Sequence, residues 1–562
     1  MHEMTKAGLS VEEVDALTGT AIGHASSATF RTADLVGLDT LQKVVGNVRN
    51  GCPNDECLDL MQGPEWFDKM VEKGLLGNKS GSGFYKATKD RDEKGKKIIL
   101  GIDAATVEYR APVKPRFACT GAVRNAGSLA EKIKIMHGSD DEGSKFLFKF
   151  FANIARYAGN RIPDIADDIV NIDNACKWGF AWEVGIFETW DILGFNDVCA
   201  RMTAEGIELP PIAKAMQKAG AESFYKKEDG VDKFFDLASN AYKTVPTNPR
   251  ELKLVNVKTK SENVVVKMDD ASLVDVGDGI VCAEFHCKMN VIGPDIVMAL
   301  NKGVDLIEEG KFDGMIVANQ GPHFCAGANL MIVLGDAMQE NWEGLENMVR
   351  GLQGVGLRMK YCSGPVVAAP HHFTFGGGVE ICQHADKVVL AGETYAGLVE
   401  VGVGVLPAGG GTTEMLVRAL EYVPANVING DAFPYVRRAF ETIGTAKVGA
   451  SGAEAIELGY FRNSDIVHPN YDHQVQKAKD VCRGMVVAGY TPPRKPKLYA
   501  LGASGKAAFE AGVWGMKEAG WASEHDMLIS GYIANVLCGG DRIAGTPMTE
   551  QDFLDLECEA FV

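Results

Sequence analysis

The spacing of apolar residues in the first part of the chain is that of amphipathic helices. At residues 10–13 the sequence S-V-E-E has the pattern of a capping box, and Val14 and Leu17 follow it at helical spacing. Farther along, Pro64 stands at the start of a second such pattern, which Gly74 ends. The pattern therefore predicts a mainly helical region.

The pattern changes near residue 255. Beyond it, short apolar or β-branched runs at residues 279–287, 314–320 and 365–369 alternate with helical patterns. This alternation is typical of α/β architecture. A segment that begins at residue 246 and contains proline and lysine precedes the change and is interpreted as a linker. We therefore expect a domain boundary near residue 255.

A weak internal repeat divides the helical part. The sequence T-A-D-L-V-G at residues 32–37 returns as T-W-D-I-L-G at residues 189–194, an offset of 189 − 32 = 157. Three flanking matches pair residues 14–15 with 172–173, 70–74 with 216–220, and 84–86 with 224–226. A chance similarity is the alternative, but four matches in the same order favour two tandem helical units.

Composition and charge narrow the classes of function. The chain is 46% hydrophobic and 23% charged, no apolar run reaches the roughly 18 residues that span a bilayer, and the opening residues lack the pattern of a secretory signal. We therefore expect a cytoplasmic protein with no membrane span. The net charge of −18 disfavours nucleic acid as a partner but permits an anionic small ligand held by local amide groups. The 13 cysteines show neither a disulfide framework nor a metal-ligand spacing, so no metal site is predicted.

Three glycine-rich stretches carry the candidate chemistry: F-C-A-G-A-N-L at residues 324–330, F-G-G-G-V-E at 375–380 and P-A-G-G-G-T at 407–412. Each stretch alone is more often a tight turn than a ligand site. The second stretch lies between a predicted strand and a helix-compatible run that contains Glu380. Unpaired N–H groups at such a helix start would face a developing negative charge, as in an oxyanion hole.

Residues 260–490 resemble the crotonase superfamily of enoyl-CoA hydratases and isomerases. The similarity rests on A-G-A-N at residues 326–329, G-G-G-V-E at 376–380 and G-L-V-E at 397–400. The two glutamates that end the second and third motifs are 400 − 380 = 20 positions apart, the spacing that hydratases of this superfamily show.

The resemblance implies a role for each of these positions. The backbone N–H groups of Ala328 and Gly377 would hold the thioester oxygen as it becomes an enolate. Glu380 would activate the water, and Glu400 would hold a proton and return it to the substrate. The adjoining positions of the two glycine turns would also bind substrate: Ala326, Gly327, Gly376 and Gly378.

Some nearby residues depart from the family pattern or suggest other chemistry. Asn329 replaces the aspartate that the family has after the A-G-A turn, so no charge-based role is predicted at that position. The other reactive side chains near the turns have no partner at a metal-ligand or nucleophile spacing. They are interpreted as structural or buried packing residues: His323, Cys325, His371, His372 and Cys382.

The upstream half resembles the C-terminal helical domain of 3-hydroxyacyl-CoA dehydrogenases, present in two copies. Residues 27–39 and 77–86 carry the first match, and residues 168–194 carry the second. The order of helical dehydrogenase domains and then a crotonase domain is similar to a bacterial bifunctional 3-hydroxyacyl-CoA dehydrogenase/enoyl-CoA hydratase family of fatty-acid β-oxidation.

The cofactor expected of that family is NAD, which is bound by an N-terminal domain with a G-x-G-x-x-G turn. Residues 1–110 contain no such turn. The expectation is a short form or fragment without the NAD module, so hydride transfer by this chain alone is not expected. The resemblance implies no cofactor at the crotonase site, where coenzyme A is part of the substrate, and NAD only if the missing domain is supplied.

Together these patterns predict a multidomain α and α/β protein. Two tandem, mainly helical dehydrogenase C-terminal-like domains are expected at residues 1–110 and 111–254, a crotonase (ClpP/crotonase-type) α/β domain at 255–490, and a helical C-terminal extension at 491–562. The resemblance implies syn hydration of trans-2-enoyl-CoA. An enoyl-CoA isomerase and a non-catalytic scaffold for a separate NAD-binding subunit are the alternatives. The expected partners are an acyl-CoA thioester, further copies of the chain, and a β-oxidation protein such as a thiolase.

Overall fold

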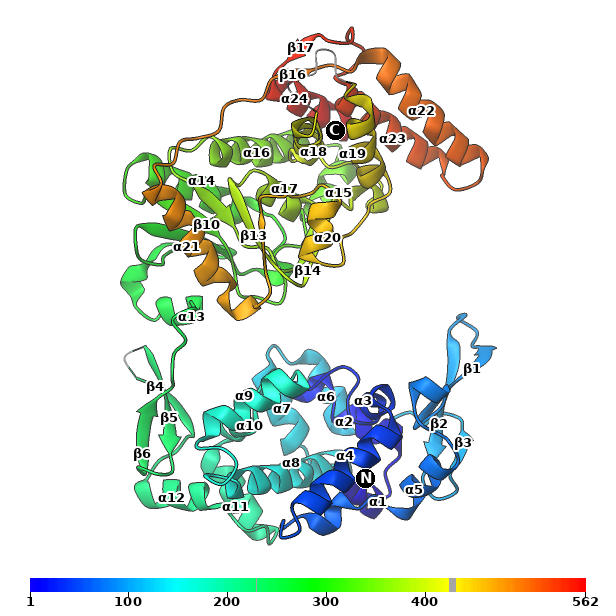
Figure 1. Ribbon diagram of the computed structural model, residues 1–562, viewed down its shortest axis with the longest axis vertical. Coiled ribbons are helices and arrows are strands. Elements are labelled where there is room, and N and C mark those ends of the chain that lie inside the picture. The colour runs from blue at the N-terminus through cyan, green and yellow to red at the C-terminus, as the bar shows by residue number, and fades with distance from the viewer. Residues whose placement is uncertain (229, 424–430) are drawn as a thin grey trace. The chain divides into compact units, whose positions relative to one another are not determined.

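The computed structural model describes residues 1–228, 230–423 and 431–562. The chain forms two compact units, Met1–Pro246 and Thr247–Val562, which appear in Figure 1 in blue to green and in green to red. Each unit has its own hydrophobic core. No helix among the described residues is both long enough and apolar enough to cross a bilayer.

The first unit contains two similar sets of helices, each followed by a three-stranded antiparallel sheet. The first set is α1 (His2–Ala7), α2 (Val11–Leu17), α3 (Phe30–Val36), α4 (Leu38–Gly51), α5 (Glu65–Glu72), β1 (Tyr85–Arg91), β2 (Lys97–Asp103) and β3 (Glu108–Arg110). The connecting helices are α6 (Ala118–Ala122), α7 (Leu129–Gly138) and α8 (Glu142–Asn160). The second set is α9 (Ile169–Phe180), α10 (Ile186–Leu193), α11 (Phe195–Ala204), α12 (Pro211–Ala219), β4 (Tyr225–Glu228), β5 (Val231–Asp236) and β6 (Ala241–Thr244).

The helix signals in the sequence are confirmed. The Ser10 hydroxyl accepts a hydrogen bond from the Glu13 N–H at 3.3 Å, and the Glu13 carboxylate accepts one from the Ser10 N–H at 2.9 Å, so the capping box starts α2. Helix α5 begins directly after Pro64, and Gly74 follows its end with a positive φ of 74°. These local signals predicted the helix ends because each satisfies, or replaces, the unpaired backbone groups of a helix terminus.

The internal repeat is confirmed at the level of single hydrogen bonds. In the first copy, the Asp34 carboxylate accepts the N–H groups of residues 84 and 85 at 2.8 and 2.9 Å. In the second copy, Asp191 accepts the N–H groups of residues 224 and 225, both at 2.7 Å. Each aspartate therefore joins a helix to the start of its sheet, and this shared bond explains why the same short motif appears twice.

A seven-stranded sheet of order β15-β13-β11-β10-β9-β8-β7 forms the centre of the second unit. Neighbouring strands are antiparallel from β7 to β9 and parallel from β9 to β15. The strands are β7 (Val264–Lys267), β8 (Ala271–Asp275), β9 (Ile280–Phe285), β10 (Gly314–Val317), β11 (Val366–Ala368), β13 (Lys387–Ala391) and β15 (Ile466–His468). The three runs predicted as strands are β9, β10 and β11. A separate parallel pair is formed by β12 (His372–Phe375) and β14 (Thr394–Gly397).

Helices cover both faces of this sheet, so the central strands are apolar throughout. Helix α14 (Pro294–Glu308) packs on one face, and α21 (Gln474–Val487) packs on the other, where Cys482 joins Ile316 in a separate core cluster. The remaining helices up to α21 are α13 (Leu254–Val257), α15 (Leu330–Met338), α16 (Trp342–Lys360), α17 (Gly377–Gln383), α18 (Gly411–Glu421), α19 (Phe433–Gly444) and α20 (Gly452–Glu457). The predicted order of helical domains and then an α/β domain is confirmed.

The C-terminal helices belong to the same body as the sheet. They are α22 (Gly502–Glu518), α23 (Glu524–Cys538) and α24 (Glu550–Phe561), and a short pair of strands, β16 (Leu498–Tyr499) and β17 (Pro547–Met548), accompanies them. Ile533 and Phe553 lie in the same core cluster as Ile296 and Leu416. Residues 491–562 therefore do not form a separate core, and α24 is close enough to the α/β layer to take part in a site there.

Candidate active site

A cavity of about 440 Å³ in the second unit brings together the residues that the sequence analysis singled out. Ala328, Gly377, Glu380 and Glu400 all line it. Its walls come from the starts of α14 and α17, from α15 and α16, and from α24. Most of the other lining side chains are apolar: Ile292, Pro294, Val297, Met298, Ile332, Met348, Val349, Leu352, Leu406, Ala408 and Phe561. Four residues from three motifs that are distant in sequence therefore line one largely apolar cavity.

Backbone pairing places the two predicted amide donors side by side. The segment before Ala328 runs parallel to β12, where the Phe375 N–H donates to the Cys325 carbonyl at 2.9 Å. A side chain built on Gly377 would have its Cβ 3.7 Å from the Ala328 nitrogen. Among the described residues, neither the Ala328 nor the Gly377 N–H donates to a backbone or side-chain acceptor. Two free N–H groups thus meet at the start of α17, where the helix dipole adds positive potential.

Glu380 lies one turn into α17 and is buried. Its Oε1 accepts a hydrogen bond from the Gly411 N–H at 2.8 Å. Burial raises the pKa of this carboxyl group to about 7, although the amides of Gly411 and Gly409 oppose that shift. The contact is close enough to require glycine, since a Cβ on Gly409 would lie 2.5 Å from Glu380 Oε2. The third glycine-rich stretch therefore surrounds the first glutamate.

Glu400 begins the short 3-10 helix Glu400–Val403 and has less hydrogen bonding than Glu380. Its Oε2 is buried and accepts no hydrogen bond from the described residues. A Cβ on Gly376 would lie 2.6 Å from Glu400 Oε1, so this carboxyl group packs against the second glycine turn. Burial, followed by the charge of Glu380, raises the pKa of Glu400 well above its usual value. The two groups therefore cannot both ionise freely.

The other predicted substrate-binding positions shape the turns. Ala326, Gly327, Gly376 and Gly378 are not among the residues that line the cavity. Gly327 and Gly376 have φ values of +98° and +51°, a region of backbone conformation that L side chains rarely adopt. These positions therefore determine where the neighbouring amides of Ala328 and Gly377 point.

The remaining side chains near the turns have structural surroundings. Asn329 caps α15, because its side chain accepts the Met331 N–H at 3.1 Å. His371 is buried with its Nε2 3.0 Å from the Gly321 carbonyl, and Cys325 and Cys382 are fully buried. The described residues contain no group of three or more His, Cys, Asp or Glu placed to hold a metal ion.

One buried acid in contact with this site was not predicted. Glu557 lies on α24, is fully buried, and accepts hydrogen bonds from the N–H groups of Gly410 and Thr413. Its local sequence, D-L-E-C-E, is that of an ordinary amphipathic helix, so no local sequence pattern indicated that Glu557 lies at the site. Its nearness to Glu380 depends on how α24 packs against α16 and α18.

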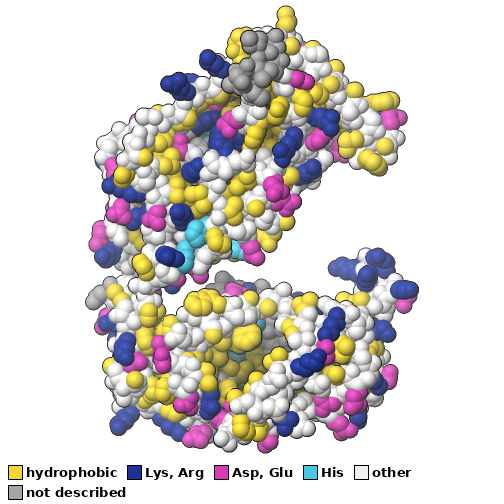
Figure 2. Space-filling view, in the orientation of Figure 1, with side chains coloured by type: hydrophobic (Ala, Val, Ile, Leu, Met, Phe, Trp, Pro, Cys, Tyr) yellow, Lys and Arg dark blue, Asp and Glu magenta, His cyan; other side chains and the backbone are white. Residues whose placement is uncertain are grey.

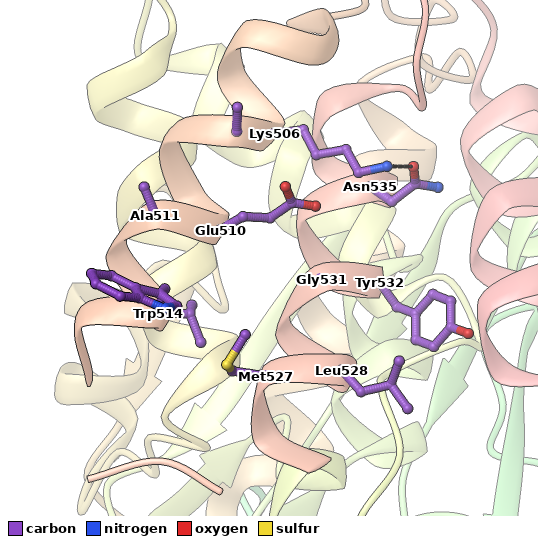
Figure 3. A pocket seen from close by; sticks show the side chains of 11 residues that line it. Lys506, Glu510, Ala511, Trp514, Met527, Leu528, Gly531, Tyr532 and Asn535 are labelled. Carbon is purple, nitrogen blue, oxygen red and sulfur yellow. Dashed lines mark hydrogen bonds between the residues drawn. The ribbon is translucent and has the colours of Figure 1, made fainter. Parts of the chain in front are cut away.

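A larger cavity, of about 720 Å³, lies in the hairpin of α22 and α23 (Figure 3). Trp514, Leu528 and Tyr532 line it, and its direct polar contact is the 2.9 Å hydrogen bond from Lys506 to Asn535. Apolar side chains also lie on the outside of this unit (Figure 2), and on the hairpin Trp521 is 80% exposed. A single carboxyl group, that of Glu510, is among the residues that line this cavity, whereas both Glu380 and Glu400 line the smaller one, so we place the chemistry in the smaller one.

Comparisons with known proteins agree with the two-part organisation. The family described as "3-hydroxyacyl-CoA dehydrogenase, C-terminal domain" matches residues 1–87, and the family described as "Enoyl-CoA hydratase/isomerase" matches residues 285–423. A "Probable 3-hydroxyacyl-CoA dehydrogenase" of Bacillus subtilis (strain 168) is 37% identical over 562 residues, which are 100% of this chain and 69% of the relative.

Two further proteins are similar to parts of the chain. A "Putative fatty acid oxidation complex trifunctional enzyme" of Rickettsia felis is 26% identical over 411 residues, 72% of this chain and 51% of the relative. The crystal structure of an enoyl-CoA hydratase from Bacillus anthracis shares 19% identity and a TM-score of 0.32, and the match covers 48% of this chain and 90% of that one. The chain thus spans about two thirds of the Bacillus subtilis relative and half of the Rickettsia felis one. Because the whole of this chain is similar to the Bacillus subtilis protein, the chain belongs to the family of 3-hydroxyacyl-CoA dehydrogenases that join the dehydrogenase C-terminal helical domain to an enoyl-CoA hydratase/isomerase domain.

Proposed function

We propose that this chain is a 2-enoyl-CoA hydratase that adds water to trans-2-enoyl-CoA and yields 3-hydroxyacyl-CoA in fatty-acid β-oxidation. One observation carries the proposal: two carboxyl groups with raised pKa values and two free N–H groups line the same apolar cavity. Hydration of a conjugated thioester requires a base for water, an acid for Cα and a donor pair for the carbonyl oxygen.

The raised pKa values of both carboxyl groups let one of them hold a proton while the other takes one from water. Glu380, whose pKa is raised to about 7 and whose Oε1 accepts the Gly411 N–H, is assigned the role of the base that takes a proton from water. Glu400, whose pKa is raised well above its usual value, is assigned the role of the acid that donates to Cα. The water oxygen bonds to Cβ, electrons move onto the thioester oxygen beside the amides of Ala328 and Gly377, and the enolate collapses as Cα takes the proton. A proton transfer from Glu380 to Glu400 then restores the starting state.

The reaction takes its atoms from water and the substrate, so the proposed site needs neither a metal nor a bound cofactor. We propose an acyl-CoA thioester as the ligand, with its acyl part against the apolar lining that includes Leu352 and Phe561. This cavity gives no support for hydride transfer with NAD, for assembly with further copies of the chain, or for a thiolase partner.

The test is the loss of enoyl-thioester absorbance with crotonyl-CoA and a longer enoyl-CoA. Glu380→Gln and Glu400→Gln should each lower kcat by on the order of 10³-fold, because each removes one proton-transfer group. Glu393→Gln, at an exposed glutamate of the same domain, is the matched control and should leave kcat unchanged.

Parallel assays separate the alternatives. Folded protein without hydration would refute the proposal and favour a scaffold, conversion of a 3-enoyl-CoA without hydration would indicate an isomerase, and NAD reduction with 3-hydroxyacyl-CoA would reveal a cofactor site elsewhere.

A further inference from the structure

Glu557 is a buried carboxyl group for which the hydration chemistry described above has no use. It lies on the inner side of α24 and forms no ion pair with a lysine or arginine of the described residues. Its Oε2 accepts the Gly410 N–H at 2.9 Å, and its Oε1 accepts the Thr413 N–H. A buried carboxyl group that binds two backbone amides of one turn is well suited to holding that turn in place.

The turn that Glu557 holds is the one that contacts Glu380. The N–H of Gly411, which lies between the two amides bound by Glu557, donates to Glu380 Oε1 at 2.8 Å. Gly410 is the N-cap of α18 and Gly411 is its first residue, so the unpaired N–H groups of one helix start are divided between two carboxyl groups. The position of the Gly411 amide therefore depends on both of them.

A second link ties the same turn to α24. The Gln353 side chain donates to the carbonyl of Ala408 at 2.8 Å and to the carbonyl of Leu554 at 2.9 Å. Leu554 lies on α24 about one helical turn before Glu557, so the two links act on neighbouring turns of one helix. Removal of the Glu557 link would leave the turn attached to α24 through Gln353.

The charge that acts on Glu557 is that of Glu380. The nearest buried ion pairs compensate one another within a cluster of two cations and two carboxylates: Lys360, Glu414, Arg418 and Glu550. The pKa of the buried His384 is lowered by desolvation, so this ring is neutral near pH 7. Burial and the charge of Glu380 raise the pKa of Glu557 to about 8, above the value of about 7 for Glu380.

We propose that Glu557 is a positioning residue of this site, which holds the Gly411 N–H against Glu380 through the turn at residues 410–413. This inference rests on the hydratase function proposed above. It makes α24 part of the site at two points, because Phe561, one helical turn beyond Glu557, lines the cavity.

The test compares Glu557→Gln with Glu550→Gln, the same chemical change at another buried position of α24. Glu557→Gln turns a side-chain N–H₂ toward a backbone N–H, so one of its two bonds to the turn is lost. We expect kcat for crotonyl-CoA hydration to fall by about 10- to 100-fold while KM changes by less than about 2-fold, because the group that orients the base has moved and the cavity has not. Glu550→Gln should lower the unfolding temperature and leave kcat unchanged.

A measurement that does not require turnover completes the test. The infrared carbonyl band of protonated Glu380, identified by its loss in Glu380→Gln, is followed against pH in the wild-type protein and in Glu557→Gln. A weaker Gly411 hydrogen bond stabilises the Glu380 carboxylate less, so its midpoint should rise. An unchanged midpoint, or equal losses of kcat in Glu557→Gln and Glu550→Gln, would overturn the proposal. An inactive wild-type protein would refute the hydratase function, and the infrared titration would still decide whether Glu557 positions Glu380.

Discussion

Buried carboxyl groups occur in both units of this chain, and their hydrogen bonding differs. In the first unit, every carboxylate oxygen of the four repeat aspartates accepts at least one N–H or O–H; these residues are Asp15, Asp34, Asp173 and Asp191. In the second unit, Glu400 has a buried oxygen that accepts no hydrogen bond from the described residues, and it shares a cavity with Glu380. The aspartates face their own backbone, whereas the glutamates face a space that a ligand can enter.

A raised pKa does not by itself distinguish these two groups of acids. Burial raises the pKa of Asp173 to about 7, the same value as for Glu380. The two groups differ in whether a carboxylate oxygen beside a cavity is left without a hydrogen bond. A structural carboxylate accepts hydrogen bonds from nearby backbone donors with its oxygens. Substitutions in the two regions should therefore have opposite consequences for activity and for stability.

The largest expected effect is on catalysis. The double variant Glu380→Gln/Glu400→Gln should lose hydration by on the order of 10³- to 10⁴-fold, and this loss should be close to that of either single variant because the two groups act as one unit. Its unfolding temperature should not fall, since a glutamine oxygen at position 380 can still accept the Gly411 N–H and Glu400 Oε2 accepts no hydrogen bond from the described residues. Single-variant and double-variant kcat values, measured beside thermal unfolding, check this. Multiplicative losses would mean that the two groups act independently.

The next effect is on the stability of the first unit. Asp191→Ala leaves the N–H groups of residues 224 and 225 without their acceptor and should cost about 2–4 kcal/mol. Hydration of crotonyl-CoA by the folded protein should be unchanged. Denaturant unfolding followed by tryptophan fluorescence measures the cost, since Trp190 lies buried in the same core. Asp164→Ala, at an exposed position, is the control and should have no such effect.

A smaller effect concerns pH. Because folding raises the pKa of Glu400 above its usual value, the folded state holds a proton that the unfolded state releases above about pH 4.5. The stability that Glu400 contributes is therefore present at acidic pH and is lost as the pH rises. Glu400→Gln should raise the unfolding temperature relative to the wild type, by about 2–4 °C per kcal/mol, and by more at pH 8 than at pH 5. An equal difference at both pH values would contradict the raised pKa.

The smallest effect is expected at Asn329. Aspartate and asparagine cap helices almost equally well, so Asn329→Asp should keep the cap on α15. We expect hydration within about 2-fold of the wild type and a stability change of a few tenths of a kcal/mol. A large gain in kcat would show that a charge at this position, which the wild-type chain lacks, assists the reaction.

Much of the fold could be predicted from local patterns. The capping box at Ser10 and the proline start at residue 64 predicted helix ends, because such signals act within one helical turn. The repeated aspartate motif predicted two tandem units, and the structure shows that Asp34 and Asp191 make the same bonds. The alternation of apolar runs predicted the strands that form the middle of the sheet.

The candidate site was predictable in part. Its two glutamates and two amide positions lie within short glycine-rich motifs, and the structure brings all four to one cavity. The neighbouring glycines, such as Gly376, were expected to bind substrate; they are not among the residues that line the cavity, and Gly327 and Gly376 have positive φ values.

By itself, the sequence determined the elements, the repeat and the residue types that hydration would need, because these depend on neighbours a few positions apart. Tertiary structure alone decided that both carboxyl groups have raised pKa values, since burial and the charge of Glu380 beside Glu400 are the causes. Tertiary structure also decided that α24 takes part. Glu557 lies 557 − 411 = 146 positions from the glycine whose amide contacts Glu380, and no local pattern reports contacts across that separation.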